Sequence, residues 1–392
     1  EPSWANIRDK VAVGDLDGAH MLAAMPLAAS LGLGGTPPVP MVVPAVLNLG
    51  GNAITVSTAL WEQMEQASPD AVQAPARALR RVVERRRAMG APPLVFAVVF
   101  AYSSHNYLLR FWLAEAGIDP ERDVRIVFVP PPLMPANLSA RYIDGFCVGE
   151  PWNQRIVDLR AGRIILSTTE IWAGHPEKVF AVTAAWAERH PNTLRAVVAA
   201  IVEAARWMDE PGNRREAARV LAQRDYVNAP EEIIAAAMAG QPRFEPDGPV
   251  LDRPDYVVFH RYAANFPWRS QAEWTLGQMR RCRQITDAVD IAALAARVYR
   301  PDIYREVARA LGAPCPNNDS KVEGVHRASW ILAEASQPMV MGPDAFCDGR
   351  AFDARDVAAY IAARINDAAD KTTNGSIGTE RRADIHAARR PS

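Results

Sequence analysis

Two positions in the sequence combine a chemically useful residue with the end of a predicted strand. His105 follows the apolar run at residues 94–100 and lies in the first turn of an expected helix, and Gly149 separates a short strand from the next helix. Ligands of α/β proteins bind at the carboxyl ends of strands, and the free amides of a helix N-terminus favour an anion. Both positions are therefore candidates for an anion site. The alternatives are a packed or capping histidine and a plain glycine turn.

Three further residues offer donors that suit the same kind of ligand. Lys178 opens the apolar strand at residues 179–182 and would supply a fixed cation. Trp4 would present an indole N–H on the first turn of a helix, and Asn52 carries a side-chain amide beside two glycines. Each has an ordinary alternative as well: a surface lysine next to Glu177, a core tryptophan and a turn asparagine.

Signatures of catalysis and of metal binding are absent from the sequence. There is no P-loop, no H-E-x-x-H and no G-x-S-x-G pattern, and no two histidines are spaced i, i+4. The glycines at residues 32–35 lead into prolines, so they do not form a dinucleotide turn. No C-x-x-C pair exists, and unpaired thiols weakly favour a reducing compartment. We therefore expect a binding protein that is not an enzyme, with no cofactor and no metal.

Composition limits the class of protein further. The 392 residues carry 44 basic and 45 acidic side chains, for a net charge of −1, and 49% are hydrophobic. Such a balance provides no global field for nucleic acid. The longest apolar stretch, residues 94–102, is far shorter than the roughly 20 residues that cross a bilayer. These values are ordinary for a globular α/β protein of two or three domains.

The order of the elements predicts two similar lobes. Strands and helices alternate up to about residue 190, which favours a largely parallel sheet, and later segments are mainly helical. The sequence Leu16-Asp17-Gly18 and the sequence Ile143-Asp144-Gly145 each connect a predicted helix to a short strand. This repetition is what two related α/β lobes in tandem would produce.

Longer motifs resemble a known family. The nitrate- and bicarbonate-binding proteins of bacterial ABC importers, together with their soluble nitrate/nitrite-sensing relatives, are similar to this chain from Glu1 to about Asp353. The segments that carry the resemblance, in the family's order, are Asp17–Met21, Val129–Pro132, Gly145–Asn153 and His175–Lys178.

The resemblance implies a two-lobed fold of the type II periplasmic-binding-protein kind with a C-terminal helical extension. The implied first lobe comprises residues 1–92 plus 170–367, the second lobe residues 93–169, and residues 368–392 are expected to form a disordered tail. Family members begin with a strand, a helix and a strand before the position of Trp4, so the first lobe is expected to be truncated.

The resemblance also implies a site and a ligand. Nitrate-binding members place a tryptophan, a glutamine, a histidine, a glycine and a lysine at the positions of Trp4, Asn52, His105, Gly149 and Lys178. The implied ligand is nitrate or nitrite, held in the cleft between the lobes. Bicarbonate-binding members are associated with calcium, which requires several oxygen ligands. Bicarbonate is therefore the alternative ligand, because Glu150 is the only acidic residue found at these positions.

Two roles are compatible with such a site. The protein would either deliver nitrate to the membrane subunits of an ABC importer or act as a sensor that holds an RNA-binding antitermination regulator, without touching nucleic acid itself. Residues 3–9 and 50–56 look closer to the sensors, which favours a cytoplasmic location over the periplasmic face of the inner membrane. An enzyme on the same fold, similar to the thiamin-precursor synthases, is a further alternative.

Overall fold

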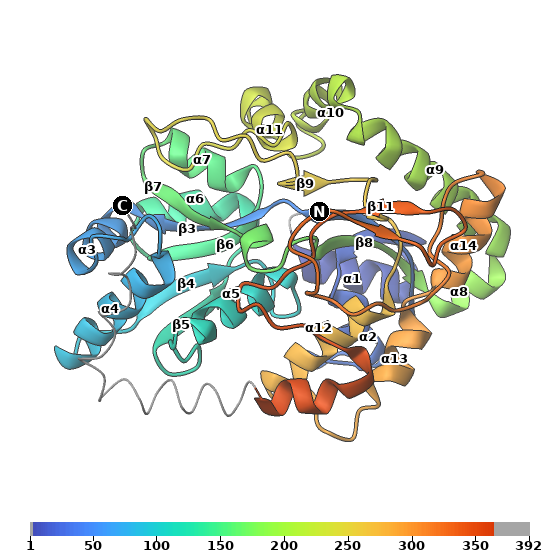
Figure 1. Cartoon of the computed structure of the whole chain (residues 1–392), viewed down its shortest axis with the longest axis horizontal. Coiled ribbons are helices and arrows are strands. Elements are labelled where there is room, and N and C mark those ends of the chain that lie inside the picture. Colours follow the sequence, from blue (N-terminus) through green and yellow to red (C-terminus); the bar gives the residue numbers. More distant parts are fainter. Residues whose placement is uncertain (1–2, 364–392) are drawn as a thin grey trace, which may run out of the picture.

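The chain folds into two lobes, each built on its own β-sheet, in a computed structural model that describes residues 3–363 (Figure 1). The helices that follow α11 in sequence lie mainly with the first lobe, so the predicted two-lobed α/β fold with a helical C-terminal part is confirmed. The expected tail at residues 368–392 lies outside the described residues.

The first lobe contains a four-stranded sheet of order β1-β8-β2-β9 in which each neighbouring pair is antiparallel. Its strands are β1 (Gly18–Leu22), β2 (Met41–Gly50), β8 (Pro176–Thr183) and β9 (Val257–Val258). Its helices are α1 (Trp4–Val13), α2 (Met25–Ser30), α8 (Ala184–Arg189), α9 (Pro191–Asp209), α12 (Arg269–Arg281), α13 (Ile291–Val298) and α14 (Pro301–Ala310).

The second lobe contains a five-stranded sheet of order β5-β4-β6-β3-β7. Its strands are β3 (Asn52–Ser57), β4 (Leu94–Val98), β5 (Val124–Phe128), β6 (Gly145–Gly149) and β7 (Gly162–Ser167). Its helices are α3 (Thr58–Ala67), α4 (Pro75–Ala88), α5 (Ser104–Glu115), α6 (Met134–Ser139) and α7 (Trp152–Asp158).

The predicted largely parallel sheet is wrong. Among the strands of residues 3–363, β4 is parallel to β5 and β6, whereas β3 is antiparallel to both β6 and β7. Parallel pairing requires a crossover helix, and α5 and α6 supply these crossovers between β4, β5 and β6. The strand β3 enters the sheet directly from the other lobe, so it runs in the opposite direction.

The chain first crosses between the lobes at Gly50 and Gly51, not near residue 92. Residues 52–57 form β3 inside the second sheet, so this strand and helices α3 and α4 belong to the second lobe. Both glycines have positive φ, 68° and 87°, and a Cβ on Gly50 would lie 2.6 Å from the carbonyl oxygen of Tyr256. A glycine is therefore required at Gly50. The chain returns to the first lobe through residues 168–175.

The Leu/Ile-Asp-Gly repetition marks equivalent places in the two lobes, as predicted. Gly18 begins β1 after α1, and Gly145 begins β6 after α6. In the second lobe, the carboxylate of Asp144 accepts a hydrogen bond of 2.7 Å from the backbone N–H of Val95, which ties this turn to β4.

The remaining elements lie at the periphery of the two sheets. The helices α10 (Arg214–Leu221) and α11 (Glu231–Met238) pack on each other along the top of the molecule in Figure 1. The strands β10 (Trp330–Leu332) and β11 (Met339–Met341) form a separate antiparallel pair. Short 3-10 turns are η1 (Pro131–Leu133), η2 (Thr168–Glu170), η3 (Pro211–Asn213) and η4 (Ala354–Asp356). Within residues 3–363, no helix combines the length and the apolar character needed to cross a membrane.

An aromatic cluster joins the two lobes on one side. Phe111 of α5 belongs to the second lobe, and its ring lies 6.0 Å from that of Trp274 on α12. Trp172, in the returning connection, lies 4.5 Å from Trp274 and 4.9 Å from Phe346 between ring centroids. All of these side chains are buried. Because the hydrophobic contact is continuous, the two lobes share one core on this side.

Removing Phe111 should therefore weaken the whole molecule. We expect Phe111→Ala to lower the free energy of unfolding by about 3–5 kcal/mol, the usual cost of a phenylalanine lost from a core. Denaturant unfolding followed by circular dichroism and by tryptophan fluorescence should still show one coincident transition. The exposed Phe128→Ala variant serves as the control, and separate transitions for the two probes would contradict a shared core.

Candidate functional site

The structure brings Asn52, His105 and Gly149 together in the second lobe. Asn52 is the first residue of β3 and pairs directly with Gly149, the last residue of β6. A Cβ on Gly149 would lie 3.2 Å from the Oδ1 atom of Asn52 and 3.9 Å from the Nε2 atom of His105. The absence of a side chain at Gly149 therefore leaves open the space between these two polar groups. The predicted boundary near residue 92 had assigned Asn52 to the first lobe, but β3 lies in the sheet of the second lobe.

Trp4 and Lys178 approach from the first lobe. Trp4 begins α1, and its ring lies 5.3 Å from the Nζ atom of Lys178, a cation–π distance. The same ring makes an edge contact with His20, with 5.4 Å between the centroids. Lys178 lies within β8 between Leu22 of β1 and Asn48 of β2. Its side chain is only 22% exposed, so it is not the ordinary surface lysine that the sequence allowed.

Glu177 joins the two sets of residues, and sequence reasoning missed it. Its side chain is 1% exposed, and its carboxylate accepts hydrogen bonds from Lys178 and, at 3.0 Å, from the Ser104 hydroxyl. The Nε2 atom of His105 lies 3.1 Å from the Oε1 atom of Glu177. An acidic residue that immediately precedes an apolar strand was the signal available in the sequence. It was interpreted only as a surface partner of Lys178.

Burial and neighbouring charges fix the protonation states. Burial lowers the pKa of His105 to about 4; Lys178 adds to this effect and Glu177 opposes it. Burial alone would raise the pKa of Glu177, but the charge of Lys178 and the proximity of His105 lower this pKa to about 2. At neutral pH, the site therefore contains a neutral imidazole and an ionised carboxylate beside an ammonium group.

Two buried side chains of the site carry polar atoms that form no hydrogen bond within the described residues. Neither the Nδ2 nor the Oδ1 atom of Asn52 has a partner among residues 3–363, although this residue is only 1% exposed. Both ring nitrogens of His105 likewise lack a hydrogen bond of acceptable geometry in the described part of the chain. A buried polar group without a partner costs about 1–3 kcal/mol, and such groups are rare in folded proteins. Their convergence indicates a ligand position.

A cavity of about 290 Å³ adjoins this position. It is lined by Asn52, Gly149 and Lys178 and by apolar side chains of α10, α11 and β9, among them Ile234 and Met238. The cavity therefore lies between the two lobes and beneath the helical pair α10–α11.

A second carboxylate, that of Glu150, lies at the same cavity. Burial raises the pKa of Glu150 to about 7, although hydrogen bonds from Tyr256 and Gln154 partly oppose the shift. The Tyr256 hydroxyl donates to the Oε1 atom of Glu150 over 2.5 Å. Within residues 3–363, no group of three or more His, Cys, Asp or Glu side chains is arranged to hold a metal ion.

The fold defines a two-lobed protein of the periplasmic-binding-protein kind, with polar side chains of both lobes gathered around Glu177. The NMT1-like family matches residues 1–222. The nitrate/nitrite binding protein NrtA of Synechococcus elongatus is 32% identical over 368 residues, which cover 92% of this chain and 77% of that protein. The chain therefore belongs to the NMT1-like family and, within it, to the nitrate- and bicarbonate-binding proteins, as its motifs predicted.

Two further comparisons support this assignment. The nitrate import ATP-binding protein NrtC of Synechocystis is 37% identical over 316 residues, which cover 80% of this chain and 45% of that protein. The chain thus spans less than half the length of this relative. The crystal structure of the periplasmic nitrate-binding protein NrtA from Synechocystis superposes with a TM-score of 0.79 at 28% identity, covering 93% of this chain and 88% of the other.

The cytoplasmic location favoured from the sequence is wrong. The solved structure that matches nearly the whole chain is that of a periplasmic protein, and the similar curated relatives include NrtA solute-binding proteins and ATP-binding proteins of importers. Short sequence similarities at residues 3–9 and 50–56, together with four cysteines, were too weak a basis for choosing a compartment.

The buried histidines predict how stability depends on pH. His105 and His175 both have a pKa lowered by burial to about 4, against 6.5 for an exposed histidine. The unfolded chain therefore binds protons below about pH 6.5 that the folded chain takes up only near pH 4. We expect the free energy of unfolding to be constant above pH 6.5 with respect to these groups. It should fall between pH 6.5 and 4, by on the order of 3 kcal/mol for each histidine.

Denaturant titrations at half-unit pH intervals measure this dependence. His105→Gln should have a shallower decline than the parent protein over the same interval, because the contribution of His105 is gone. An identical pH profile for the two proteins would show that His105 is not buried in its neutral form.

Proposed function

We propose that this chain is a non-enzymatic solute-binding protein that captures nitrate or nitrite between its lobes and delivers it to an ABC importer. The observation that carries the proposal is the convergence of the buried Asn52 amide, which has no hydrogen bond within the described residues, and the imidazole of His105 at Gly149. The ammonium group of Lys178 lies nearby, because Lys178 and His105 contact the same carboxylate, that of Glu177. The names of the relatives support nitrate as the solute and an importer as the destination.

The donors suit a small planar anion. Asn52 offers an amide N–H, His105 offers one ring N–H, and Lys178 provides the positive charge. Hydrogen bonds to charged groups contribute about 1.5–3 kcal/mol each. Gly149 permits close approach of the anion, because a larger residue would meet the amide of Asn52. On the first-lobe side, the ring of Trp4 lies 5.3 Å from the Nζ atom of Lys178. The shorter Asn52 would take the place of the glutamine that the family resemblance implies.

The importer role is preferred to the sensor role. A sensor that holds an RNA-binding antitermination regulator is suggested by the resemblance of residues 3–9 and 50–56 to the sensors, but the comparisons contradict the cytoplasmic location that this resemblance favours. Catalysis is also disfavoured at the thiol that lies closest in sequence to Gly149. Cys147 is fully buried in β6, and burial raises the pKa of its thiol far above the ordinary value, so it is inert as a nucleophile.

Bicarbonate is the second candidate, and Glu177 is the observation that favours it. Bicarbonate carries one O–H group that needs an acceptor, whereas nitrate carries none. The carboxylate of Glu177 and the Oδ1 atom of Asn52 are acceptors at the site. A bicarbonate transport ATP-binding protein, CmpC of Synechococcus elongatus, is 33% identical over 92% of this chain and 49% of that protein.

The donors can be tested one at a time. We expect His105→Ala and Lys178→Ala each to weaken nitrate binding at least tenfold, which corresponds to about 1.4 kcal/mol, when measured by titration calorimetry. The exposed His190→Ala variant should bind as the parent protein does. Unchanged affinity in both site variants would mean that nitrate binds elsewhere.

Glu177→Gln distinguishes the two anions. Removal of the negative charge should strengthen nitrate binding, because it leaves Lys178 unneutralised, and should weaken bicarbonate binding, because a charged acceptor becomes a neutral one. Parallel calorimetry with both anions at pH 8, together with the unfolding midpoint of the variant, measures this. Weaker binding of both anions in a folded variant would contradict the assignment of Glu177 as the discriminating acceptor.

A further inference from the structure

We propose that the cavity at the ligand site also holds short-chain aliphatic carboxylates, with the carboxylate group at the anion donors and the alkyl chain against the apolar side chains of the cavity. This inference rests on the proposed function, because both kinds of ligand use the same donors. It follows from the size of the cavity, from the apolar character of much of its lining and from the network that holds this lining.

The cavity is larger than a small inorganic anion requires. Its volume of about 290 Å³ lies close to the lower limit of the roughly 300–1,000 Å³ found for pockets that hold organic ligands. Nitrate and bicarbonate consist of a central atom with its oxygen atoms, and they extend only one bond length from that atom. Much of the cavity is therefore left over when such an ion lies beside Asn52 and Gly149.

Apolar side chains form a large part of the lining, and we call the following six the apolar wall. They belong to one small hydrophobic cluster, separate from the larger clusters around the two sheets, and comprise Met208, Leu221, Val227, Ile234, Met238 and Phe259. The oxygen atoms of an inorganic anion gain nothing from contact with these side chains. An alkyl chain removes them from water, and each buried CH₂ group strengthens binding about fourfold.

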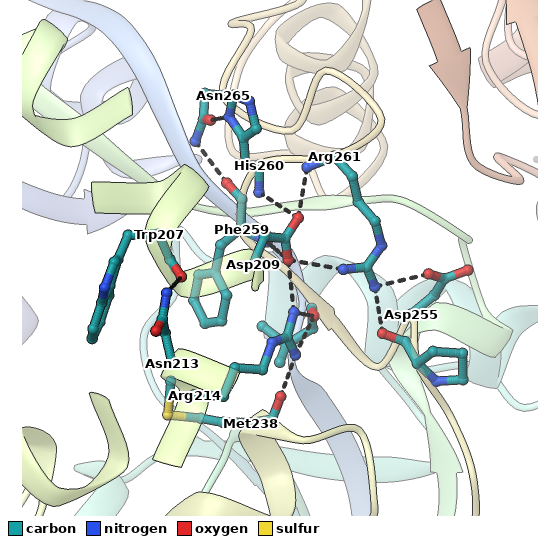
Figure 2. A network of polar contacts seen from close by, with 12 residues as sticks. Trp207, Asp209, Asn213, Arg214, Met238, Asp255, Phe259, His260, Arg261 and Asn265 are labelled. Carbon is teal, nitrogen blue, oxygen red and sulfur yellow. Dashed lines mark hydrogen bonds and ion pairs between the residues drawn. The ribbon is translucent and has the colours of Figure 1, made fainter. Parts of the chain in front are cut away.

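A buried ionic network holds the elements that carry the apolar wall, as Figure 2 shows. The Asp209 carboxylate, at the end of α9, accepts a hydrogen bond from Arg214 over 2.6 Å. It also accepts from the backbone N–H groups of His260 and Arg261 over 3.0 and 2.7 Å. Arg214, the first residue of α10, donates in turn to the carbonyl oxygen of Met238 at the end of α11. The network thus connects α9, α10, α11 and the segment after β9.

This network opposes collapse of the apolar wall into the cavity. The side chains of Asp209 and Arg214 are only 9% and 8% exposed, and breaking a buried ion pair is strongly destabilising. The guanidinium of Arg214 also lies 5.5 Å from the centre of the Phe259 ring, which belongs to the wall. An apolar space that stays open leaves its lining without contacts on one side, and an alkyl chain supplies those contacts.

The anion donors of the site suit a carboxylate as they suit nitrate. Both ions are planar, carry one negative charge and present oxygen atoms on a trigonal centre, but the third position of a carboxylate bears a carbon chain. The Asn52 amide is buried without a hydrogen bond in the described part of the chain, and Gly149 leaves space beside it. Because Asn52 and Lys178 line the same cavity as the apolar wall, one ligand can contact both.

Titration calorimetry of the full chain with nitrate, acetate and pentanoate at pH 8 tests this inference. We expect pentanoate to bind at least tenfold more tightly than acetate, because it buries three further CH₂ groups, and to compete with nitrate. The variant Leu221→Gln should weaken pentanoate binding at least fivefold and change nitrate binding less than twofold, because it makes the apolar wall more polar. The matched control is Val220→Gln, at the neighbouring position of α10. Val220 is 44% exposed, so this variant should bind both anions as the parent protein does.

Three results would overturn the inference: equal affinities for acetate and pentanoate, pentanoate binding that does not compete with bound nitrate, or unchanged pentanoate binding in a folded Leu221→Gln variant. Unfolding midpoints show whether each variant is folded, and the comparison of acetate with pentanoate decides the question without any variant. If nitrate binds and pentanoate does not, this inference fails and the proposed function stands. If pentanoate binds more tightly than acetate and nitrate does not bind, the proposed function fails and this inference stands. Both fail if neither anion binds.

Discussion

The arrangement of the site depends on one buried negative charge, the carboxylate of Glu177. An ionised carboxylate without water is tolerated only when it is paired and hydrogen-bonded. Its partners come from both lobes: Lys178 lies beside it on β8, and Ser104 and His105 come from the start of α5. The need to satisfy this charge therefore holds the first turn of α5 against β8. It also places an imidazole and an ammonium group within reach of one ligand.

The charge of Glu177 also affects which anions the site can select. The charges of Glu177 and Lys178 cancel formally, so an anion is attracted less by net charge than by donors already fixed in place. Asn52 supplies such a donor because folding leaves its polar atoms without a hydrogen bond within the described residues, and His105 supplies one because its contact with Glu177 uses only one ring nitrogen. A site of this kind distinguishes an ion with a proton to donate from one without, since both acceptors and donors face the ligand.

Around the site, the two lobes are joined at more than one place. A continuous aromatic core lies on the side of the returning connection. Residues 239–256 contact the second lobe through backbone amides, through the apolar packing of Phe244 and through ion pairs with Arg160 and Arg163. The buried ion pair of Asp209 and Arg214 holds the start of this segment, because Arg214 also donates to the carbonyl oxygen of Met238.

The sequence by itself determined the motifs, the family, the two-lobed α/β class and the local positions of His105 at a helix start and Gly149 at a strand end. Each of these depends on residue types within a short window, where apolar periodicity and turn residues act locally. The tertiary structure alone decided that β3 pairs in the second sheet, that the strands are mostly antiparallel and that Glu177 is buried. These features depend on which distant segments meet, and apolar periodicity shows only that a face is buried, not what covers it.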